Sequence, residues 1–193
     1  MKIYLVATAA AAFCLPGIAA AQDHNDVAKQ DGLRIEARIG YETPTVSGDG
    51  DVYKIGSAVS YGGEIGFDLK AGHSVVVGPY AVYEFSSVNL CDGGDCIGEN
   101  GNLGVGGRVG FIVGPKAQVY LKAGYASIDM KASVGNQSAS QSKGGVQGAI
   151  GVDYNFTRNV YGMVELNYAD YGKFAGVINL QRRHAAAGIG IRF

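Results

Sequence analysis

The chain has 193 residues, with 16 Lys and Arg against 17 Asp and Glu and a formal net charge of -1. Nucleic-acid binding needs an excess of basic residues, which this chain lacks, so we expect no nucleic-acid partner. The 31 Gly, 12 Tyr and only 4 Pro favour a β-protein, since average Gly usage is about 7%. The length indicates one domain.

The N-terminal residues have the pattern of an export signal. Lys2 precedes an apolar run from Ile3 to Ala12, and Ala19-Ala20-Ala21 before Gln22 is a small-residue cleavage site. The run is too short for a membrane-spanning helix, which needs about 20 residues. We therefore expect three parts: a cleaved signal peptide over 1–21, a leader over 22–32, and one folded domain over 33–193.

Apolar and polar residues alternate with period two in eight segments, as in strands whose faces meet different media. Each has about the 9 to 11 residues that a tilted strand needs to cross a bilayer. The final segment, for example, alternates Ala187, Ile189, Ile191 and Phe193 with glycines and Arg192. The predicted strands are Leu33–Tyr41, Ala58–Leu69, Val75–Ser86, Leu103–Val113, Gln118–Ser127, Val146–Tyr154, Val160–Tyr168 and Arg182–Phe193.

The connections between these segments alternate in length. Short turns on the periplasmic side and longer loops outside are typical of outer-membrane barrels, and an even strand count leaves both ends in the periplasm. The predicted short turns are Lys70–Ser74, Gly114–Ala117 and Asn155–Asn159. The predicted outer loops are Glu42–Ser57, Ser87–Asn102, Ile128–Gly145 and Ala169–Gln181.

The apolar face carries its aromatic residues at two heights, as expected of rings that gather at membrane interfaces. Positions between them, such as Ile39, Ile65 and Val109, are smaller. The outer girdle is predicted to be Tyr41, Tyr61, Tyr83, Phe85, Tyr125 and Tyr168, and the inner girdle Phe67, Phe111, Tyr154 and Phe193. The pattern predicts an all-β, eight-stranded antiparallel up-and-down transmembrane β-barrel. A soluble periplasmic lipocalin-like carrier is an alternative, but it has no reason to separate rings by height.

The opposite face carries charges of both signs. An eight-stranded barrel has an interior that side chains fill, so we expect these charges to pair across a closed lumen. The predicted lumen network is Arg34, Glu36, Arg38, Glu64, Glu84, Arg108, Lys122, Glu165 and Arg192, with Asp68, Asp153 and Arg182 on the same face.

Two stretches are similar to a known family. Residues 155–172, NFTRNVYGMVELNYADYG, resemble the penultimate turn and strand of small outer-membrane barrels of the OmpA and opacity-protein type, and GIGIRF over 188–193 resembles their last strand. The resemblance implies an eight-stranded barrel in the bacterial outer membrane, with surface-exposed loops. It also implies that Phe193 is an assembly signal read by the barrel-assembly machinery.

We therefore expect a monomeric, non-enzymatic protein with an envelope-structural or surface-interaction role, adhesin-like or opacity-like, through four extracellular loops. Its expected partners are outer-membrane lipid and lipopolysaccharide, the assembly machinery, and an extracellular molecule. Basic residues at or near the outer rim are candidates for contact with lipopolysaccharide: Lys143, Lys173, Arg182 and Arg183.

A lipid-modifying enzyme is the alternative function, and it needs a nucleophile with a base. After removal of the signal peptide the histidines are His24, His73 and His184, of which His184 points into the lumen and could meet Glu84 or Glu165. A hydrogen bond in a polar interior explains His184 without catalysis. No cofactor is expected.

Cys91 and Cys96 flank Asp92-Gly93-Gly94-Asp95 in an outer loop. The oxidising periplasm favours a disulfide between them, with two free thiols as the alternative. No second Cys or His pair accompanies them, so no zinc site is expected. The run Asp49-Gly50-Asp51 lacks the remaining oxygen ligands of a calcium loop and is read as a turn.

Overall fold

The computed structural model describes residues 28–48, 51–54, 56–92, 95–134, 137–174 and 178–193. The predicted signal peptide and leader residues 22–27 lie outside these ranges. The described part is all-β, and its strands are β1 Gly32–Gly48, β2 Asp51–Lys54, β3 Ala58–Lys70, β4 Val75–Ser86, β5 Asn89–Asp92, β6 Asp95–Val113, β7 Ala117–Val134, β8 Gln137–Asn155, β9 Val160–Phe174 and β10 Ile178–Arg192. None of the described residues belongs to a helix long and apolar enough to cross a membrane.

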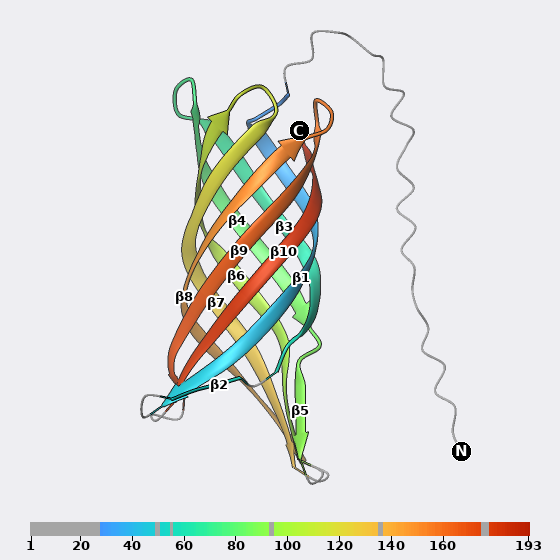
Figure 1. Cartoon of the computed structure of the whole chain (residues 1–193), viewed down its shortest axis with the longest axis vertical. Coiled ribbons are helices and arrows are strands. Elements are labelled where there is room, and N and C mark those ends of the chain that lie inside the picture. Colours follow the sequence, from blue (N-terminus) through green and yellow to red (C-terminus); the bar gives the residue numbers. More distant parts are fainter. Residues whose placement is uncertain (1–27, 49–50, 55, 93–94, 135–136, 175–177) are drawn as a thin grey trace, which may run out of the picture.

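Eight of these strands close into an antiparallel barrel (Figure 1). Around the barrel their order is β1, β3, β4, β6, β7, β8, β9 and β10, and β10 pairs with β1 from Arg34↔Arg192 to Ser47↔Asn179. In hydrocarbon no water can satisfy an unpaired N–H or C=O group, so a spanning sheet must close on itself. The β1–β10 pairing provides that closure and confirms the predicted eight-stranded barrel.

Successive side chains along each strand alternate between a buried inner face and an exposed outer face. On β3, Glu64, Gly66 and Asp68 are buried, whereas Ile65 and Phe67 are 52% and 43% exposed. The exposed apolar side chains thus belong to the outer surface, and the charged ones lie inside. This distribution of side chains is the reverse of that in a soluble barrel, and it is expected of a barrel that lipid surrounds.

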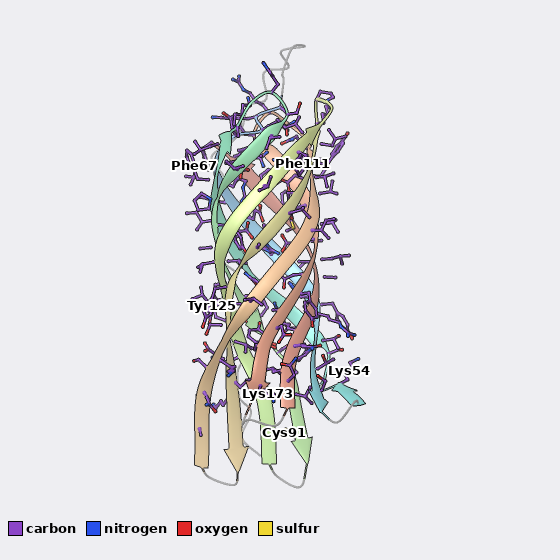
Figure 2. All side chains as sticks on the ribbon, turned by 90° about the vertical axis from the view of Figure 1, so that its left-hand side faces the viewer. Lys54, Phe67, Cys91, Phe111, Tyr125 and Lys173 are labelled. Atoms are coloured by element: carbon purple, nitrogen blue, oxygen red, sulfur yellow. A yellow bond between two sulfur atoms is a disulfide. The ribbon has the colours of Figure 1, made fainter. Side chains whose placement is uncertain are left out.

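The aromatic rings of the outer surface lie in two bands. Phe67 and Phe111 lie near the end of the barrel that holds the C-terminus, and Tyr125 lies toward the opposite end (Figure 2). Neighbouring rings of the outer band contact each other, since Tyr61 and Phe85 stack with centroids 5.5 Å apart. Rings at both ends of the apolar outer surface are typical of the two membrane interfaces.

The strands reach farther outward than the sequence predicts. β4 has the predicted bounds, but β6 begins at Asp95, β7 ends at Val134 and β8 begins at Gln137. The prediction of four long loops is therefore wrong for most of the length of each: Glu42–Ser57, Ser87–Asn102, Ile128–Gly145 and Ala169–Gln181. Beyond the membrane both faces of a strand meet water, so the alternation that marks a strand disappears although backbone pairing continues.

The periplasmic mouth of the barrel is covered by residues 28–31. The Lys29 N–H donates to the Arg158 carbonyl oxygen at 2.9 Å, and Arg192 Nη1 donates to the Lys29 carbonyl oxygen at 3.0 Å. Gln30 Nε2 donates to the Pro115 carbonyl oxygen at 3.4 Å, and Ala28 and Gln30 are buried. The segment before β1 therefore packs across the inner end of the lumen.

Replacing Ile65 with Arg should lower the free energy of unfolding by about 2 to 4 kcal/mol, because the charge enters hydrocarbon near the middle of the bilayer. Leu69→Arg lies on the same strand and face but beside the periplasmic turn, where the cost falls to about 0 to 1 kcal/mol. Urea unfolding in lipid vesicles measures both variants. Equal losses would contradict the assigned membrane position.

Candidate functional site

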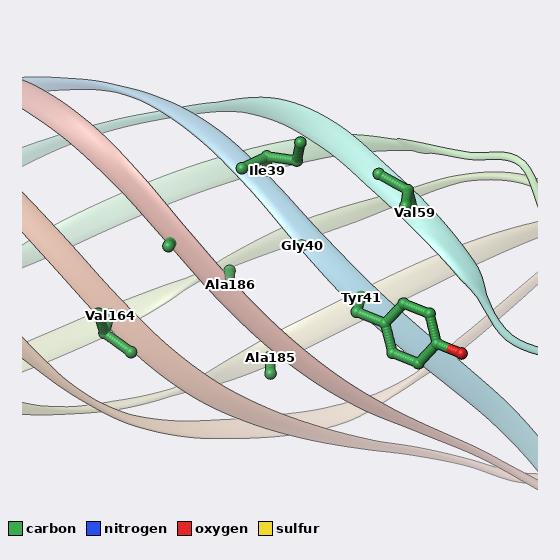
Figure 3. Close-up of a pocket in the computed structure, with 8 residues that line it drawn as sticks. Ile39, Gly40, Tyr41, Val59, Val164, Ala185 and Ala186 are labelled. Atoms are coloured by element: carbon green, nitrogen blue, oxygen red, sulfur yellow. The ribbon is translucent and has the colours of Figure 1, made fainter.

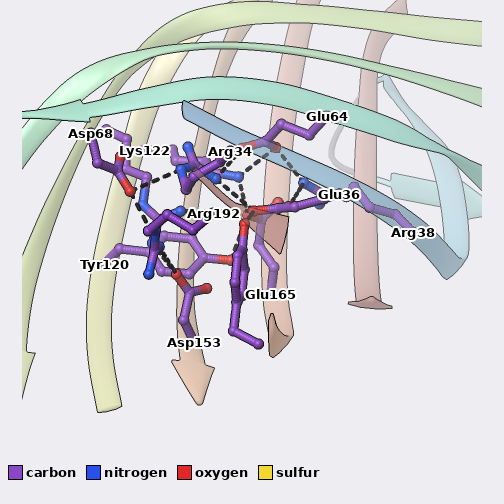
Figure 4. Close-up of polar contacts among 12 residues, drawn as sticks. Arg34, Glu36, Arg38, Glu64, Asp68, Tyr120, Lys122, Asp153, Glu165 and Arg192 are labelled. Atoms are coloured by element: carbon purple, nitrogen blue, oxygen red, sulfur yellow. Dashed lines mark hydrogen bonds and ion pairs between the residues drawn. The ribbon is translucent and has the colours of Figure 1, made fainter. Parts of the chain in front are cut away.

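The lumen contains a balanced set of buried charges in its inner and middle parts. Among the described residues this set comprises five basic and five acidic side chains, all at most 5% exposed, and Figure 4 shows how they meet around the barrel axis. Its members are Arg34, Arg38, Arg108, Lys122 and Arg192 with Glu36, Glu64, Asp68, Asp153 and Glu165. Buried ions are tolerated when they are paired, so each carboxylate of this set needs a cation beside it.

Lys122 is at the centre of this set. Its Nζ lies 2.6 Å from Glu64 Oε2 and 2.6 Å from Glu165 Oε2, so one ammonium bridges carboxylates on β3 and β9. Arg38 on β1 joins the same two carboxylates at 2.5 Å each. The Tyr120 hydroxyl donates to Glu165 at 2.9 Å. Strands on opposite walls are thereby tied through the lumen.

A second group of contacts joins the inner end. Asp153 on β8 accepts from Arg108 at 2.5 Å and from Arg192 at 3.0 Å, and Arg192 also reaches Asp68 at 3.3 Å. The Arg108 guanidinium lies 3.8 Å from the centroid of the Tyr120 ring. The rings thus fill the space beside the ion pairs and take part in cation–π contacts with them.

The outer end of the lumen is richer in acid. Arg182 contacts Glu42, Glu84 at 3.0 Å and Glu99 at 3.5 Å, so three buried carboxylates surround one guanidinium. Neither carboxylate oxygen of Glu99 has a hydrogen-bond partner among the described residues. Arg38 Nε lies 3.3 Å from Glu84 and connects this acid-rich group to the balanced one.

His184 belongs to the acid-rich end and has the contacts of a nucleophile–base–acid arrangement. Its Nε2 lies 2.8 Å from the Ser60 hydroxyl, and its Nδ1 lies 3.5 Å from Glu84 Oε2. Ser60 is fully buried, however, and Glu84 is shared with Arg182. A substrate carbonyl therefore cannot contact this hydroxyl unless lumen side chains move.

The structure places all nine residues of the predicted network inside the barrel. Glu42 and Glu99 also lie there, although sequence reasoning assigned both to loops. Glu42 lies at an alternate position of the same strand as Arg34, Glu36 and Arg38. A longer predicted first strand would therefore have placed Glu42 in the lumen. Strict alternation from the exposed Leu103 would make Glu99 face outward. The register shift between Glu99 and Gly101 turns its side chain inward.

Other predicted residues lie apart from this network. The sequence predicts that Arg182 faces inward and also that it is a candidate for contact with lipopolysaccharide at the outer rim. The second prediction is wrong, because the side chain is 1% exposed. His73 is exposed in the turn after β3, whereas His24, Asp49 and Gly50 lie outside the described residues. Among the described residues, no group of three His, Cys, Asp or Glu is arranged to hold a metal ion.

Cys91 and Cys96 form a disulfide between β5 and β6. They are directly opposite each other in the antiparallel register, with Cα atoms 4.1 Å apart. The Glu99 N–H donates to the Val88 carbonyl oxygen at 3.0 Å at the base of the same hairpin. The crosslink therefore joins the two strands of a small hairpin, β5 and the outer end of β6.

Beyond the outer ring band, the outer parts of β6, β7 and β8 form an extracellular sheet together with the short strand β5 (Figure 2). β7 and β8 remain paired out to Val134↔Gln137, and β6 pairs with β7 out to Cys96↔Ser133. On its other side, β8 pairs with β9 only from Val146↔Asp170 onward. Residues 137–145 of β8 consequently present an unpaired edge among the described strands.

A closed barrel with an apolar outer surface, ring bands and a charge-filled lumen defines a small transmembrane β-barrel. The chain matches the family model described as outer membrane protein beta-barrel domain over residues 5–193. It belongs to that family, and its location is the bacterial outer membrane. A search of curated protein sequences found no match.

Solved structures of outer-membrane proteins have the same fold. Ail of Yersinia pestis, in complex with the heparin analogue sucrose octasulfate, is 18% identical with a TM-score of 0.55 over 84% of this chain and 99% of that chain. Neisserial surface protein A is 16% identical with a TM-score of 0.60 over 82% and 97%. The N-terminal barrel domain of Pseudomonas aeruginosa OprF is 18% identical with a TM-score of 0.50 over 81% and 97%.

Replacing Lys122 with Met should cost about 3 to 5 kcal/mol of stability, because Glu64 and Glu165 keep their buried charges while losing a shared cation. Lys131→Met, at an exposed position on the same strand, should change stability by less than about 0.5 kcal/mol. Adding Glu165→Gln to Lys122→Met should recover part of the loss. Urea unfolding compares the three variants, and a Lys122→Met protein as stable as Lys131→Met would refute the network's role.

Proposed function

We propose that this chain is a non-enzymatic surface-interaction protein, adhesin-like or opacity-like, whose barrel is a rigid support for the extracellular sheet. The observation that carries the proposal is the unpaired outer edge of β8. The partner it fits is an extended segment of another polypeptide, which adds a strand to the edge through backbone hydrogen bonds.

The side chains of this edge leave its backbone accessible. Ser138, Ser140, Gln141 and Ser142 are exposed, and the edge contains no Pro. Proteins commonly protect free edges with charges, Pro, bulges or a covering segment. Within 137–145 the one charged residue is Lys143. The edge therefore has the features of a pairing surface.

A peptide partner suits the charges of the sheet better than a sulfated sugar. Ail was crystallised with a sulfated ligand. Such a polyanion needs clustered basic groups. On β7 of this chain, however, Asp129 lies two residues from Lys131 on the same face of the strand. Opposite charges side by side cancel the attraction for a polyanion, whereas they leave backbone pairing unaffected.

The buried position of Ser60 favours a non-enzymatic role over a lipid hydrolase. An acyl-transfer nucleophile must reach its substrate, and the Ser60 hydroxyl is buried beside His184 among the side chains of the lumen. Incubation with a fluorophosphonate probe tests the point, with the Ser60→Ala variant as control. We expect equal, background labelling of both proteins, and labelling that depends on Ser60 would support the enzyme instead.

The remaining partners follow from the location. We propose that the barrel is a monomer whose outer surface contacts outer-membrane lipid and lipopolysaccharide. The Phe193 ring is 55% exposed beside the inner mouth, and its N–H donates to the Leu33 carbonyl oxygen at 2.9 Å. This exposed ring is the group we propose for recognition by the barrel-assembly machinery.

Shortening the β7–β8 hairpin tests the surface-interaction function. Replacing residues 130–141 with Asn-Gly joins Asp129 to Ser142 by a tight turn. The variant should keep the heat-dependent electrophoretic mobility of a folded barrel but bind an array of short random peptides at least about tenfold more weakly, which is about 1.4 kcal/mol.

A matched control keeps the hairpin and changes Ser138, Ser140 and Ser142 to Ala. Its backbone edge is intact, so its peptide binding should equal that of the unmodified protein. Cells that display the three proteins should adhere to a protein-coated surface in the same order. Undiminished binding by the shortened variant would refute the role of the edge.

A further inference from the structure

A groove runs along β10 on the lipid-facing surface, with a volume of about 420 Å³ (Figure 3). Tyr41 of the outer ring band forms part of its wall, so the groove lies in the half of the membrane nearest the outside. The lining residues are Ile39, Gly40, Tyr41, Val59, Val164, Ala185, Ala186 and Ala187.

The register of three strands explains the shape of the groove. Ala187 on β10 pairs with Ile39 on β1 and with Val164 on β9, and both larger neighbours are about 60% exposed. In the next row Ala185 lies between Tyr41 and Leu166. Two exposed alanines therefore form a floor, and the larger apolar side chains of β1 and β9 form its walls.

The two ends of the groove differ in chemistry. At the inner end the next outward residue of β10 is Ile189, an exposed apolar side chain. At the outer end the next residue is Arg183, which is exposed and lies between Thr43 and Tyr168 in the register. A second hollow, lined by Thr43, Arg183 and Ala185 among others, continues the groove toward Arg183.

Arg183 has no ion-pair or hydrogen-bond partner among the described residues, unlike the buried Arg182 beside it in the sequence. Its position is level with Tyr168 of the outer ring band, where lipid headgroups begin. A guanidinium binds phosphate through parallel hydrogen bonds, and phosphate is the anionic group that membrane lipids present at this height.

We propose that the groove binds one molecule of lipid A, the phosphorylated lipid of the outer leaflet, with one acyl chain on Ala185 and Ala187 and one phosphate on Arg183. The distance from Ala187 to Arg183 along the strand is about 13 Å, at about 3.3 Å per residue, which accommodates an extended stretch of acyl chain. The proposal rests on the outer-membrane location and does not depend on the extracellular sheet.

Native mass spectrometry of the folded protein in detergent, titrated with purified lipid A, tests the site. We expect one lipid A to bind tightly to the unmodified protein. Arg183→Gln, which removes the charge, and Ala187→Leu, which fills the floor, should each weaken binding about tenfold. Arg183→Lys keeps the charge and should retain most of the affinity.

Two control variants repeat the same changes elsewhere. Ala123→Leu fills a lipid-facing position between Gly107 and Gly148, on a strand whose next outward charge is Asp129. Lys131→Gln removes an exposed cation from the extracellular sheet. Both should bind lipid A as the unmodified protein does, and the electrophoretic mobility shift on boiling verifies that every variant is folded.

Three results would overturn the site. Equal affinities of Ala187→Leu and Ala123→Leu would mean that the groove contributes nothing. Unchanged affinity of Arg183→Gln would remove the phosphate contact. Equally tight binding of phosphatidylethanolamine, in a parallel titration, would mean that the groove holds any acyl chain and has no preference for lipid A.

Discussion

The structure depends on one constraint: hydrocarbon offers no hydrogen-bond partner to the backbone, so each spanning strand must pair on both sides. The β1–β10 pairing satisfies the last two edges. Closure in turn separates two faces, because alternate side chains of every strand point to lipid or to the lumen. Outside the membrane water satisfies the backbone and the constraint ends. Residues 137–145 of β8 can therefore leave one edge unpaired where the spanning residues cannot.

The charge-filled lumen follows from the same closure. Eight strands leave room for side chains and little else, so an ionic group placed inside must contact a group of opposite charge. Arg38 and Lys122 each join carboxylates from different strands, and Arg192 and Arg108 share Asp153. Such crosslinks through the interior resist the relative movement of opposite walls. We infer that they make the barrel a stiff base for the sheet outside, at the cost of an open pore.

The membrane-spanning part was predictable from sequence because lipid and lumen impose opposite demands on neighbouring residues. Val75–Ser86 has the bounds that alternation predicted, and Arg34, Glu64 and Lys122 lie inside. The extracellular part was not predictable in this way. Ser138, Ser140 and Ser142 look like a polar loop because water surrounds both faces of their strand. The inward position of Glu99 was not predicted, because it depends on a register shift that no local sequence pattern marks. The groove along β10 could not be predicted either, because its shape depends on the register of β1, β9 and β10.

Single-channel recording in a planar bilayer tests whether the lumen is closed, since a lumen filled by paired side chains should not pass ions. A porin with about 16 strands, whose lumen is an aqueous channel, is the positive control for insertion and detection. We expect a silent baseline for this protein after its insertion is verified by recovery from the membrane. Discrete, sustained conductance steps would show an open water-filled path, and they would contradict the closed lumen on which the rigid-support argument depends.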